Sequence, residues 1–233
     1  MARLVSRHVC RGFSRKYYRF RATRFYGGSA TADCVGCNLK CFYCWSRRVR
    51  DRPWLQYAGF LSPEEVAGRL LDIAVRYGFR IVRISGNEPL LCREHLIRVL
   101  ECLEDRMDGR VFVLETNGTL LNLETARMLR PFRGFLHVRV SLKGACEREF
   151  NMVTGAEGFS LQVKALENLY REGVSCNAAI MAELTTVETL RRVRWIVKRA
   201  NPKAWVELES YVPYGGVDHS GRLREVSKLC LGT

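Results

Sequence analysis

The chain of 233 residues contains no run of 18 or more apolar residues, so it holds no segment long enough to span a membrane as a helix. Residues Met1 to Arg24 are rich in arginine but lack the apolar core of a secretory signal peptide. No internal repeat, low-complexity tract or long linker occurs. We therefore expect no membrane partner and a cytoplasmic location, where thiols stay reduced.

The signatures of several large enzyme classes are also missing. The sequence has no G-x-S-x-G, no H-E-x-x-H and no Walker loop, which are typical of serine hydrolases, zinc proteases and P-loop proteins. The four histidines, His8, His95, His137 and His219, form no motif, and we expect His95 and His137 to be structural. Acid–base or nucleophilic hydrolysis is therefore disfavoured.

Acidic residues are few relative to basic ones. The chain has 24 Asp and Glu against 38 Lys and Arg, which gives a formal net charge of +14. Two basic clusters flank residues 34–44, and aromatic residues are interleaved with the first cluster. This composition is compatible with RNA binding through phosphate contacts and stacking, and also with a solvated arginine-rich surface. The clusters comprise Arg3, Arg7, Arg11, Arg15, Lys16, Arg19, Arg21 and Arg24, and then Arg47, Arg48, Arg50 and Arg52.

Three of the ten cysteines, Cys37, Cys41 and Cys44, form a C-x3-C-x2-C pattern. Three thiolates can hold three irons of a cubane iron–sulfur cluster and leave the fourth iron open for chemistry. With Cys34 the loop also reads C-x2-C-x3-C-x2-C, which invites a zinc interpretation. Zinc sites usually separate two C-x2-C pairs by about a dozen residues or more, so three intervening residues make that arrangement hard. We interpret Cys34 as a small packing residue.

The remaining cysteines are scattered singly, unlike the framework of a small disulfide-rich secreted protein. Most lie in apolar surroundings, where cysteine behaves as a small hydrophobic residue. No second cysteine-rich region exists after residue 216, so we expect no auxiliary iron–sulfur cluster. The scattered cysteines are Cys10, Cys92, Cys102, Cys146, Cys176 and Cys230.

Helical and strand patterns alternate after the cysteine loop, which predicts an α/β fold. Ser62 and Glu65 form a capping box that opens one helix, and Thr185 with Glu188 opens a later one. With one strand before the cysteines, at about Arg21 to Tyr26, the pattern indicates roughly six βα units and a partial (β/α)6 TIM-like barrel. The other expected strands are 80–85, 111–115, 135–142, 174–181 and 204–208, and the expected helices are 66–77, 96–107, 121–129, 159–170 and 185–199.

Polar motifs follow the carboxyl ends of three expected strands, which is where the chemistry of such barrels takes place. Each motif alone is also compatible with an ordinary strand-end turn. In the last strand Glu207 and Glu209 alternate, and we expect only one of them to face the barrel interior. The motifs are Ser85-Gly86-Asn87-Glu88-Pro89, Glu115-Thr116-Asn117-Gly118 and Ser141-Leu142-Lys143-Gly144.

The cysteine loop, with Tyr43 directly before Cys44, resembles the C-x3-C-x-aromatic-C loop of the radical S-adenosylmethionine (radical SAM) superfamily. The resemblance runs from about Tyr18 to Gly216 and is closest to compact glycyl-radical-enzyme activating enzymes, such as that of pyruvate formate-lyase. It implies a [4Fe–4S] cluster and S-adenosylmethionine (SAM) as cofactors, with Cys37, Cys41 and Cys44 as the metal ligands. Reductive cleavage of SAM would yield a radical that abstracts hydrogen from a substrate.

The resemblance also implies which residues bind SAM. Ser85 to Pro89 are similar to the family's glycine-glycine-glutamate-proline motif beside the SAM amino group, with Asn87 in place of the second glycine. Lys143 keeps the cation that lies near the SAM carboxylate in activating enzymes, and Ser141 replaces an acid. No catalytic residue beyond the cluster ligands follows. The implied cofactor-binding residues are Tyr43, Ser85, Gly86, Asn87, Glu88, Glu115, Asn117, Ser141 and Lys143.

Three functional hypotheses follow. The first is a radical SAM enzyme that abstracts hydrogen from a protein or peptide and receives electrons from a flavodoxin- or ferredoxin-like reductant. The second is a radical SAM enzyme that modifies RNA, which the basic aromatic N-terminal region favours. The third is a non-catalytic iron–sulfur or zinc-binding module. We expect a basic extension at residues 1–20, the barrel at 21–216 and a tail at 217–233.

Overall fold

A computed structural model describes residues 1–55, 57–213 and 218–229. Their contacts divide the chain into two compact units. The first unit comprises residues 1–38, 48–116 and 127–138, and the second comprises residues 39–47, 117–126 and the chain from 139 onward. The expected domain boundaries stay a prediction: the one at residue 20 falls within a strand, and the one at residue 216 lies outside the described residues.

The first unit contains a mixed sheet in the order β1-β2-β3-β5-β6, followed by the amino-terminal half of β7. β3, β5 and β6 pair in parallel, whereas β1, β2 and β4 form antiparallel pairs, with β4 joined to β2. The parallel strands therefore end at one edge, where the predicted polar motifs begin. These strands are β1 (Cys10–Arg11), β2 (Ser14–Thr23), β3 (Ser29–Cys34), β4 (Gly59–Leu61), β5 (Ile81–Gly86) and β6 (Val111–Thr116).

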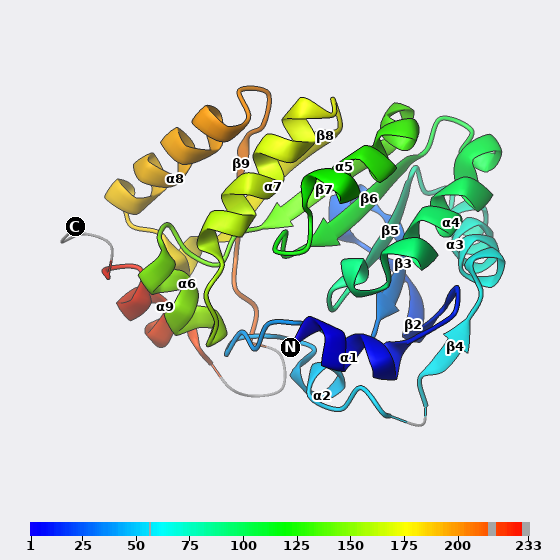
Figure 1. Cartoon of the computed structure of the whole chain (residues 1–233), viewed down its shortest axis with the longest axis horizontal. Helices are drawn as coiled ribbons and strands as arrows, with labels where there is room; N and C mark the ends of the chain where they lie inside the picture. Colours follow the sequence, from blue (N-terminus) through cyan, green and yellow to red (C-terminus); the bar gives the residue numbers. More distant parts are fainter. Residues whose placement is uncertain (56, 214–217, 230–233) are drawn as a thin grey trace. The chain divides into compact units, whose positions relative to one another are not determined.

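Helices α3 and α4 lie side by side in the first unit and pack beside its parallel strands (Figure 1). The capping box that opens α3 is confirmed, because the Ser62 and Glu65 side chains each accept a hydrogen bond from the other residue's main-chain N–H. Its buried face includes Val66, Leu70 and Ala74. The helices of this unit are α1 (Ala2–Val9), α3 (Pro63–Tyr77) and α4 (Arg93–Leu103), while α2 (Arg47–Arg50) and α5 (Leu123–Leu129) contribute residues to both units.

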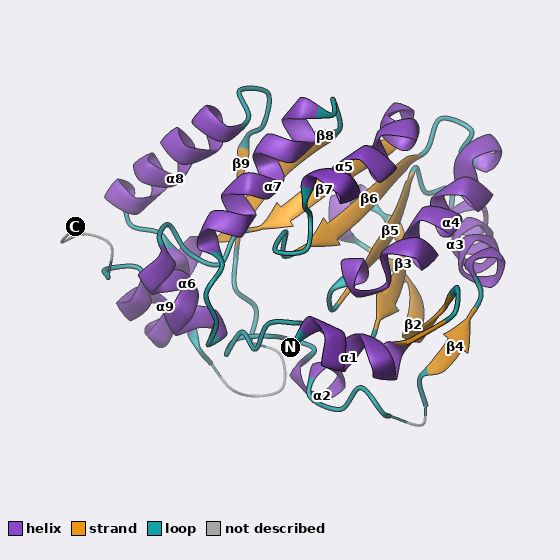
Figure 2. Cartoon of the chain, viewed as in Figure 1, coloured by secondary structure: helices purple, strands orange, loops and turns teal. Residues whose placement is uncertain are grey.

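The second unit continues from the carboxyl-terminal half of β7 (Leu136–Ser141) in the order β7-β8-β9. β8 (Ser175–Met181) and β9 (Val206–Glu209) pair in parallel. The helices α7 (Phe159–Arg171) and α8 (Val187–Ala200) pack against each other and against these strands (Figure 2). The remaining helices of this unit are α6 (Glu147–Thr154) and α9 (Ser220–Val226).

The predicted partial (β/α)6 barrel is confirmed. Six strands, β3 and β5 to β9, alternate with helices. The strand order is open, because β1 and β9 stand at its two ends. Within the described ranges, no helix combines the length and the apolar character that crossing a bilayer requires.

Two local predictions are wrong. The strand before the cysteines is β3, at Ser29–Cys34, whereas residues 21–23 end β2 and Phe25–Gly27 forms a 3-10 turn. β3 consists of small residues that are buried at every position, so it lacks the bulky alternation by which a strand is recognised in sequence. The cap of α8 is Thr186, which pairs with Thr189, one residue later than expected.

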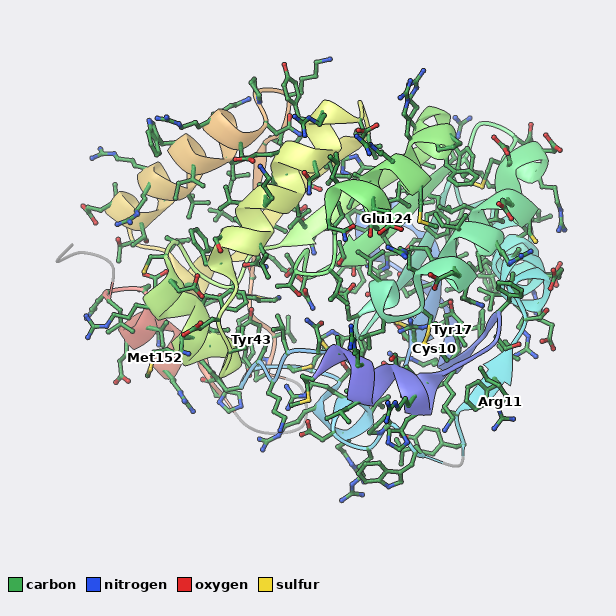
Figure 3. The ribbon with its side chains drawn as sticks, viewed as in Figure 1. Cys10, Arg11, Tyr17, Tyr43, Glu124 and Met152 are labelled. Carbon is green, nitrogen blue, oxygen red and sulfur yellow. A yellow bond between two sulfur atoms is a disulfide. The ribbon has the colours of Figure 1, made fainter. Side chains whose placement is uncertain are left out.

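Cys10 and Cys92 form a disulfide in the first unit (Figure 3). The interpretation of Cys92 as a small hydrophobic residue is therefore wrong, and Cys146 is disulfide-bonded as well. The Cys10–Cys92 bond joins β1 to the end of a 3-10 turn at Pro89–Cys92, beside a core cluster that includes Val9 and Val35. The two cysteines are 82 residues apart, and sequence spacing carries no information about such a contact. The free cysteines among the described residues include Cys37, Cys41 and Cys44.

His95 of α4 is buried and has a partner on each ring nitrogen. Its Nδ1 lies 2.6 Å from the carbonyl oxygen of Phe13, and its Nε2 lies 3.1 Å from the hydroxyl of Tyr17. A neutral imidazole satisfies both contacts by donating from Nδ1 and accepting at Nε2. Burial lowers the pKa of His95 to about 4, so the ring stays neutral and serves the fold.

We expect this histidine to make stability depend on pH. Between the ordinary histidine pKa near 6.5 and about 4, the unfolded chain binds the proton and the folded chain does not, so stability falls as the pH drops through this window. The loss reaches about 3 kcal/mol, since one pKa unit corresponds to about 1.4 kcal/mol. Denaturant unfolding at several pH values should show a flatter profile for His95→Gln than for the wild type. The exposed His8→Gln should keep the wild-type slope, and identical profiles for all three proteins would refute the assignment.

Candidate functional site

The residue directly before the cysteine trio is tied to the turn that follows β5. The Gly36 N–H donates to Asn87 Oδ1 at 2.9 Å, and the Glu88 N–H donates to the Gly36 carbonyl oxygen at 2.9 Å. Gly36 has a φ of +88°, and a Cβ there would lie 2.8 Å from a methyl group of Val5, so only glycine fits. The start of the predicted cluster loop and the predicted SAM motif therefore lie side by side in the first unit.

The turn after β5 requires glycine at position 86 and accepts asparagine at position 87. Gly86 has a φ of +96°, and a Cβ there would lie 2.9 Å from the main-chain N and O of Cys34. Asn87 has no such backbone angle, since the positive-φ residues other than glycine in the described ranges are Tyr26 and Asp108. Asparagine thus replaces the family's second glycine without backbone strain, and its side chain holds Gly36.

Arg15 of β2 braces the same two segments from within the core. Its side chain is almost fully buried, and its guanidinium donates to the carbonyl oxygens of Pro89 at 2.8 Å, Glu88 at 2.8 Å and Val35 at 3.1 Å. A planar guanidinium can satisfy several acceptors at once, which a lysine ammonium does less well. In the sequence Arg15 belongs to a basic cluster, and no feature of its spacing distinguishes it from the exposed arginines around it.

The Glu88 carboxylate is also buried and held. It accepts hydrogen bonds from the Thr116 hydroxyl at 2.7 Å and from the Leu90 N–H at 3.0 Å. Thr116 ends β6, so this contact links the ends of neighbouring parallel strands. Buried carboxylates persist where donors compensate their lost hydration, and these two bonds supply that compensation.

Glu115 of β6 contacts Ser85, another residue that the resemblance implies for cofactor binding. Its carboxylate accepts from the Ser85 hydroxyl at 2.5 Å, from the Arg83 guanidinium at 3.1 Å and from the Tyr26 hydroxyl at 2.8 Å. Ser85 and Glu115 were both expected near SAM, and they contact each other. The arginine keeps a negative charge favourable at this position.

In the second unit, the predicted cluster loop is anchored to the end of α6. The Lys40 N–H donates to the Thr154 carbonyl oxygen at 3.2 Å, and the Phe42 N–H donates to that of Val153 at 3.0 Å. A turn follows, in which the Cys44 N–H donates to the Cys41 carbonyl oxygen at 3.2 Å. The loop holding Cys41 and Cys44 is thus fixed by its main chain, which leaves both thiols available as ligands.

Lys143, Ser141 and Tyr43 lie together in the second unit. The Lys143 ammonium donates to the Ser141 hydroxyl at 2.6 Å and lies 5.6 Å from the centre of the Tyr43 ring. Burial lowers the pKa of Lys143, but the nearby Tyr43, Cys41 and Glu209 groups raise that pKa above its usual value overall. Lys143 therefore remains a cation beside Cys41 of the predicted cluster loop.

Asn117, another residue that the resemblance implies for cofactor binding, uses its side-chain oxygen in contacts within its own turn. Asn117 Oδ1 accepts from the Thr119 N–H at 3.0 Å and from the Thr119 hydroxyl at 2.6 Å. The buried Gln162 donates to the main-chain oxygens of Asn117 at 2.5 Å and Ser141 at 2.9 Å. Gln162 thus connects the predicted segment at Asn117 with the one at Ser141. In the sequence it is one position of an expected helix, and nothing there indicates this role.

The expectation that only one of Glu207 and Glu209 faces the interior is wrong. Arg139 of β7 donates to Glu207 at 2.9 and 3.0 Å and to Glu209 at 3.0 Å. Side chains two residues apart on a strand point to the same face, so both carboxylates reach one guanidinium. The Asn177 side chain donates to Glu207 at 2.7 Å, which completes a polar cluster across β7, β8 and β9.

The thiols present suit an iron–sulfur cluster. Cys37 belongs to the first unit and Cys41 and Cys44 to the second, and none of the three is disulfide-bonded. Cys34 is fully buried, and burial raises the pKa of its thiol, which keeps it protonated and fits a packing role. No group of three or more His, Cys, Asp or Glu residues among those described is arranged around one ion position. A cubane spreads three thiolates over three irons and does not require such a common point.

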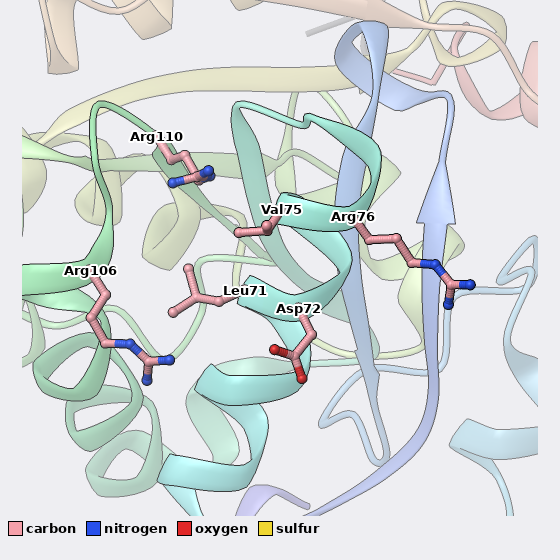
Figure 4. Close-up of a pocket in the computed structure, with 6 residues that line it drawn as sticks. All are labelled: Leu71, Asp72, Val75, Arg76, Arg106 and Arg110. Atoms are coloured by element: carbon pink, nitrogen blue, oxygen red, sulfur yellow. The ribbon is translucent and has the colours of Figure 1, made fainter.

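A hollow of about 380 Å³ lies elsewhere on the first unit, on the outer side of α3 (Figure 4). None of the predicted site residues lines it, so it is separate from the site described above. Its lining residues are Leu71, Asp72, Val75, Arg76, Arg106 and Arg110.

We expect loss of the Arg15 brace to destabilise the first unit. Arg15→Met leaves the buried carbonyl oxygens of Val35, Glu88 and Pro89 without these donors, which should lower the free energy of unfolding by about 3 kcal/mol. The exposed Arg24→Met serves as control and should change stability by less than about 0.5 kcal/mol. Chemical denaturation measures both, and equal stability of the two variants would contradict the brace.

A family model for the radical SAM superfamily matches residues 33–201. Among curated proteins, a probable GTP 3′,8-cyclase of Thermococcus kodakarensis is 28% identical over 176 residues, covering 75% of this chain and 54% of that protein. An Fe-coproporphyrin III synthase of Methanosarcina barkeri is 32% identical over 140 residues, covering 59% of this chain and 32% of that protein. The chain thus spans about half of the first relative's length and a third of the second's.

Two solved structures share the fold. SuiB of Streptococcus suis, bound to the precursor peptide SuiA, has a TM-score of 0.64 at 17% identity and covers 83% of this chain and 43% of its own. The anSMEcpe protein with bound AdoMet and Cp18Cys peptide has a TM-score of 0.57 at 20% identity, covering 76% and 48%. Because the family match extends over most of the chain, this protein belongs to the radical SAM superfamily, whose enzymes use a [4Fe–4S] cluster and SAM.

Proposed function

We propose that this radical SAM enzyme abstracts hydrogen from a protein or peptide, in the manner of glycyl-radical-enzyme activating enzymes. The observation that carries the proposal is the pair of hydrogen bonds that joins Gly36 to Asn87 and Glu88. These bonds hold the start of the cysteine loop against the turn expected to bind the SAM amino group. The peptide part is supported by SuiB and anSMEcpe, which share the fold and are solved with peptides.

Cys37, Cys41 and Cys44 would hold the cluster in this proposal. When bound, the cluster and SAM together supply reductive cleavage of the sulfonium and the hydrogen-abstracting species. Lys143, which stays protonated, provides a cation for the SAM carboxylate. The turn at residues 85–88, fixed by Gly36, Arg15 and Thr116, would orient the SAM amino group, and Glu115 with Asn117 would lie on the ribose side. Tyr43 would lie against the adenine.

A peptide substrate also suits the cluster of Arg139, Glu207, Glu209 and Asn177. The Glu207 and Glu209 side chains keep 33% and 32% of their surface exposed while paired to the arginine. The exposed part of each carboxylate can accept hydrogen bonds from the N–H groups of a peptide. We propose this cluster as the polar contact for the substrate main chain.

The proposal includes an external one-electron reductant, flavodoxin- or ferredoxin-like, because reductive cleavage of SAM consumes one electron. It includes a cytoplasmic location, because cluster assembly requires Cys37, Cys41 and Cys44 to be reduced, whereas the Cys10–Cys92 disulfide shows that not every thiol of the chain is reduced. RNA is the second candidate substrate, favoured by the exposed basic and aromatic residues of the N-terminal region. A non-catalytic module would form no 5′-deoxyadenosine from SAM.

Cys41→Ala is expected to abolish the brown chromophore and all SAM cleavage after anaerobic reconstitution, because two thiolates hold a cubane poorly. Absorbance spectra report the cluster, and chromatography of 5′-deoxyadenosine after chemical reduction reports cleavage. Cys34→Ala is the matched control, since Cys34 is buried and proposed to pack, and should retain both signals. Cleavage that persists in Cys41→Ala would remove the basis of the ligand assignment.

The substrate class is tested by the origin of the abstracted hydrogen. The enzyme is reduced with SAM in the presence of either deuterated protein or deuterated RNA, both from the same cell culture. The proposal predicts deuterium in 5′-deoxyadenosine with the protein fraction, because the atom is taken from the substrate. Deuterium that arises with the RNA fraction alone would replace the peptide proposal by the RNA one.

A further inference from the structure

The N-terminal segment carries positive side chains beyond those that hold the fold and the candidate site together. The first 32 residues contain eight Lys and Arg and no Asp or Glu. Arg15 and Lys16 donate to main-chain carbonyl oxygens, and Arg19 and Arg21 pair with Asp33. The remaining four are exposed: Arg3, Arg7, Arg11 and Arg24.

Packing turns the charged side of α1 outward. Val9 and Val5 of α1 belong to one hydrophobic cluster with Ala58 and Leu55, so the apolar side of the helix faces these two residues. Arg3 and Arg7 are one helical turn apart and therefore share a face of α1. His8 lies against Trp54, with ring centroids 6.4 Å apart.

Exposed aromatic rings accompany these charges. Trp54 is 62% exposed and Tyr57 is 65% exposed, although tryptophan is usually mostly buried. Arg11 places its guanidinium 4.4 Å from the centre of the Phe60 ring (Figure 3). We name this set the N-terminal basic surface: Arg3, Arg7, Arg11, Arg52, Trp54 and Tyr57.

Negative charge is nearly absent around this surface. Residues 1–61 contain two acidic residues, Asp33 and Asp51. Asp33 is buried against Arg19 and Arg21, and Asp51 pairs with Arg50 at 2.8 Å. The part of the chain that carries this surface is therefore strongly basic, which favours polyanions as ligands.

We propose that the N-terminal basic surface binds single-stranded nucleic acid. Phosphates would pair with the arginines of α1 and β1, and unpaired bases would stack on Trp54 and Tyr57. An acidic protein could also pair with the arginines, but such binding would not require the exposed rings of Trp54 and Tyr57. The proposal goes beyond the proposed function, since it requires neither the cluster nor SAM and holds whichever molecule donates hydrogen.

The test is fluorescence anisotropy of labelled 12-residue oligonucleotides of RNA and DNA with the reconstituted full-length chain, at several salt concentrations. A polyglutamate peptide of similar charge is the third probe. The wild type should bind at least one of the two oligonucleotides tightly and polyglutamate weakly, because stacking requires bases. The triple variant Arg3→Ala, Arg7→Ala, Arg11→Ala should lower the salt slope by about 2, since each phosphate contact to a single strand contributes about 0.7. The double variant Trp54→Ala, Tyr57→Ala should weaken binding at least about thirtyfold with an unchanged salt slope, since each stacked base contributes about 1 kcal/mol or more.

A matched control comes from α8, which carries exposed Arg191, Arg192 and Arg194 beside Trp195, 61% exposed. Replacing these three arginines by alanine removes the same charge elsewhere and should leave affinity and slope near wild-type values. If the control weakens binding as much as the α1 variant does, the chain binds through its general charge and the proposal is overturned. Equal affinity for polyglutamate, or an unchanged affinity in the aromatic variant, overturns it as well. Circular dichroism of every variant confirms that the comparisons concern folded protein.

Discussion

The site depends on one requirement, that buried main-chain groups find partners. Residues 35–36 lie against the turn at residues 87–89, and the main-chain groups of both segments are shielded from water. Each of these groups would cost about 1–3 kcal/mol if it were left unpaired. Arg15, Asn87 and the Gly36 peptide satisfy them in a single network. The network fixes where the cysteine loop begins and where the turn after β5 lies, so a structural constraint also sets the geometry proposed for SAM.

The two units contribute different chemistry. The first holds carboxylates in place, because Glu88 and Glu115 are each met by two or more donors. The second supplies a cation, Lys143, and a polar cluster on Arg139 whose carboxylates remain accessible. SAM carries both an ammonium and a carboxylate, so groups of both charges are present for the contacts proposed above.

Sequence patterns predicted the features that rest on local rules. The cap of α3 follows from Ser62 and Glu65, and the strand–helix alternation predicts an open α/β barrel. The rest depends on contacts between residues far apart in sequence. β3 is made of small residues that carry no strand signal, Cys92 meets Cys10 across 82 residues, and Arg15 looks like any other arginine of its segment. Glu207 and Glu209 are two residues apart on one strand, so the alternation of a strand places both on the same face. The expectation that only one faces the interior did not take this into account.

The central claim is that three thiolates leave one iron of a cubane open to SAM. Electron paramagnetic resonance of the anaerobically reconstituted and reduced chain, recorded with and without SAM and combined with iron analysis, tests it most directly. The account predicts about four irons per chain in a [4Fe–4S] signal that changes when SAM is added, because SAM binds the open iron. A chain that assembles no cubane, or one whose signal is unaffected by SAM, would contradict the account.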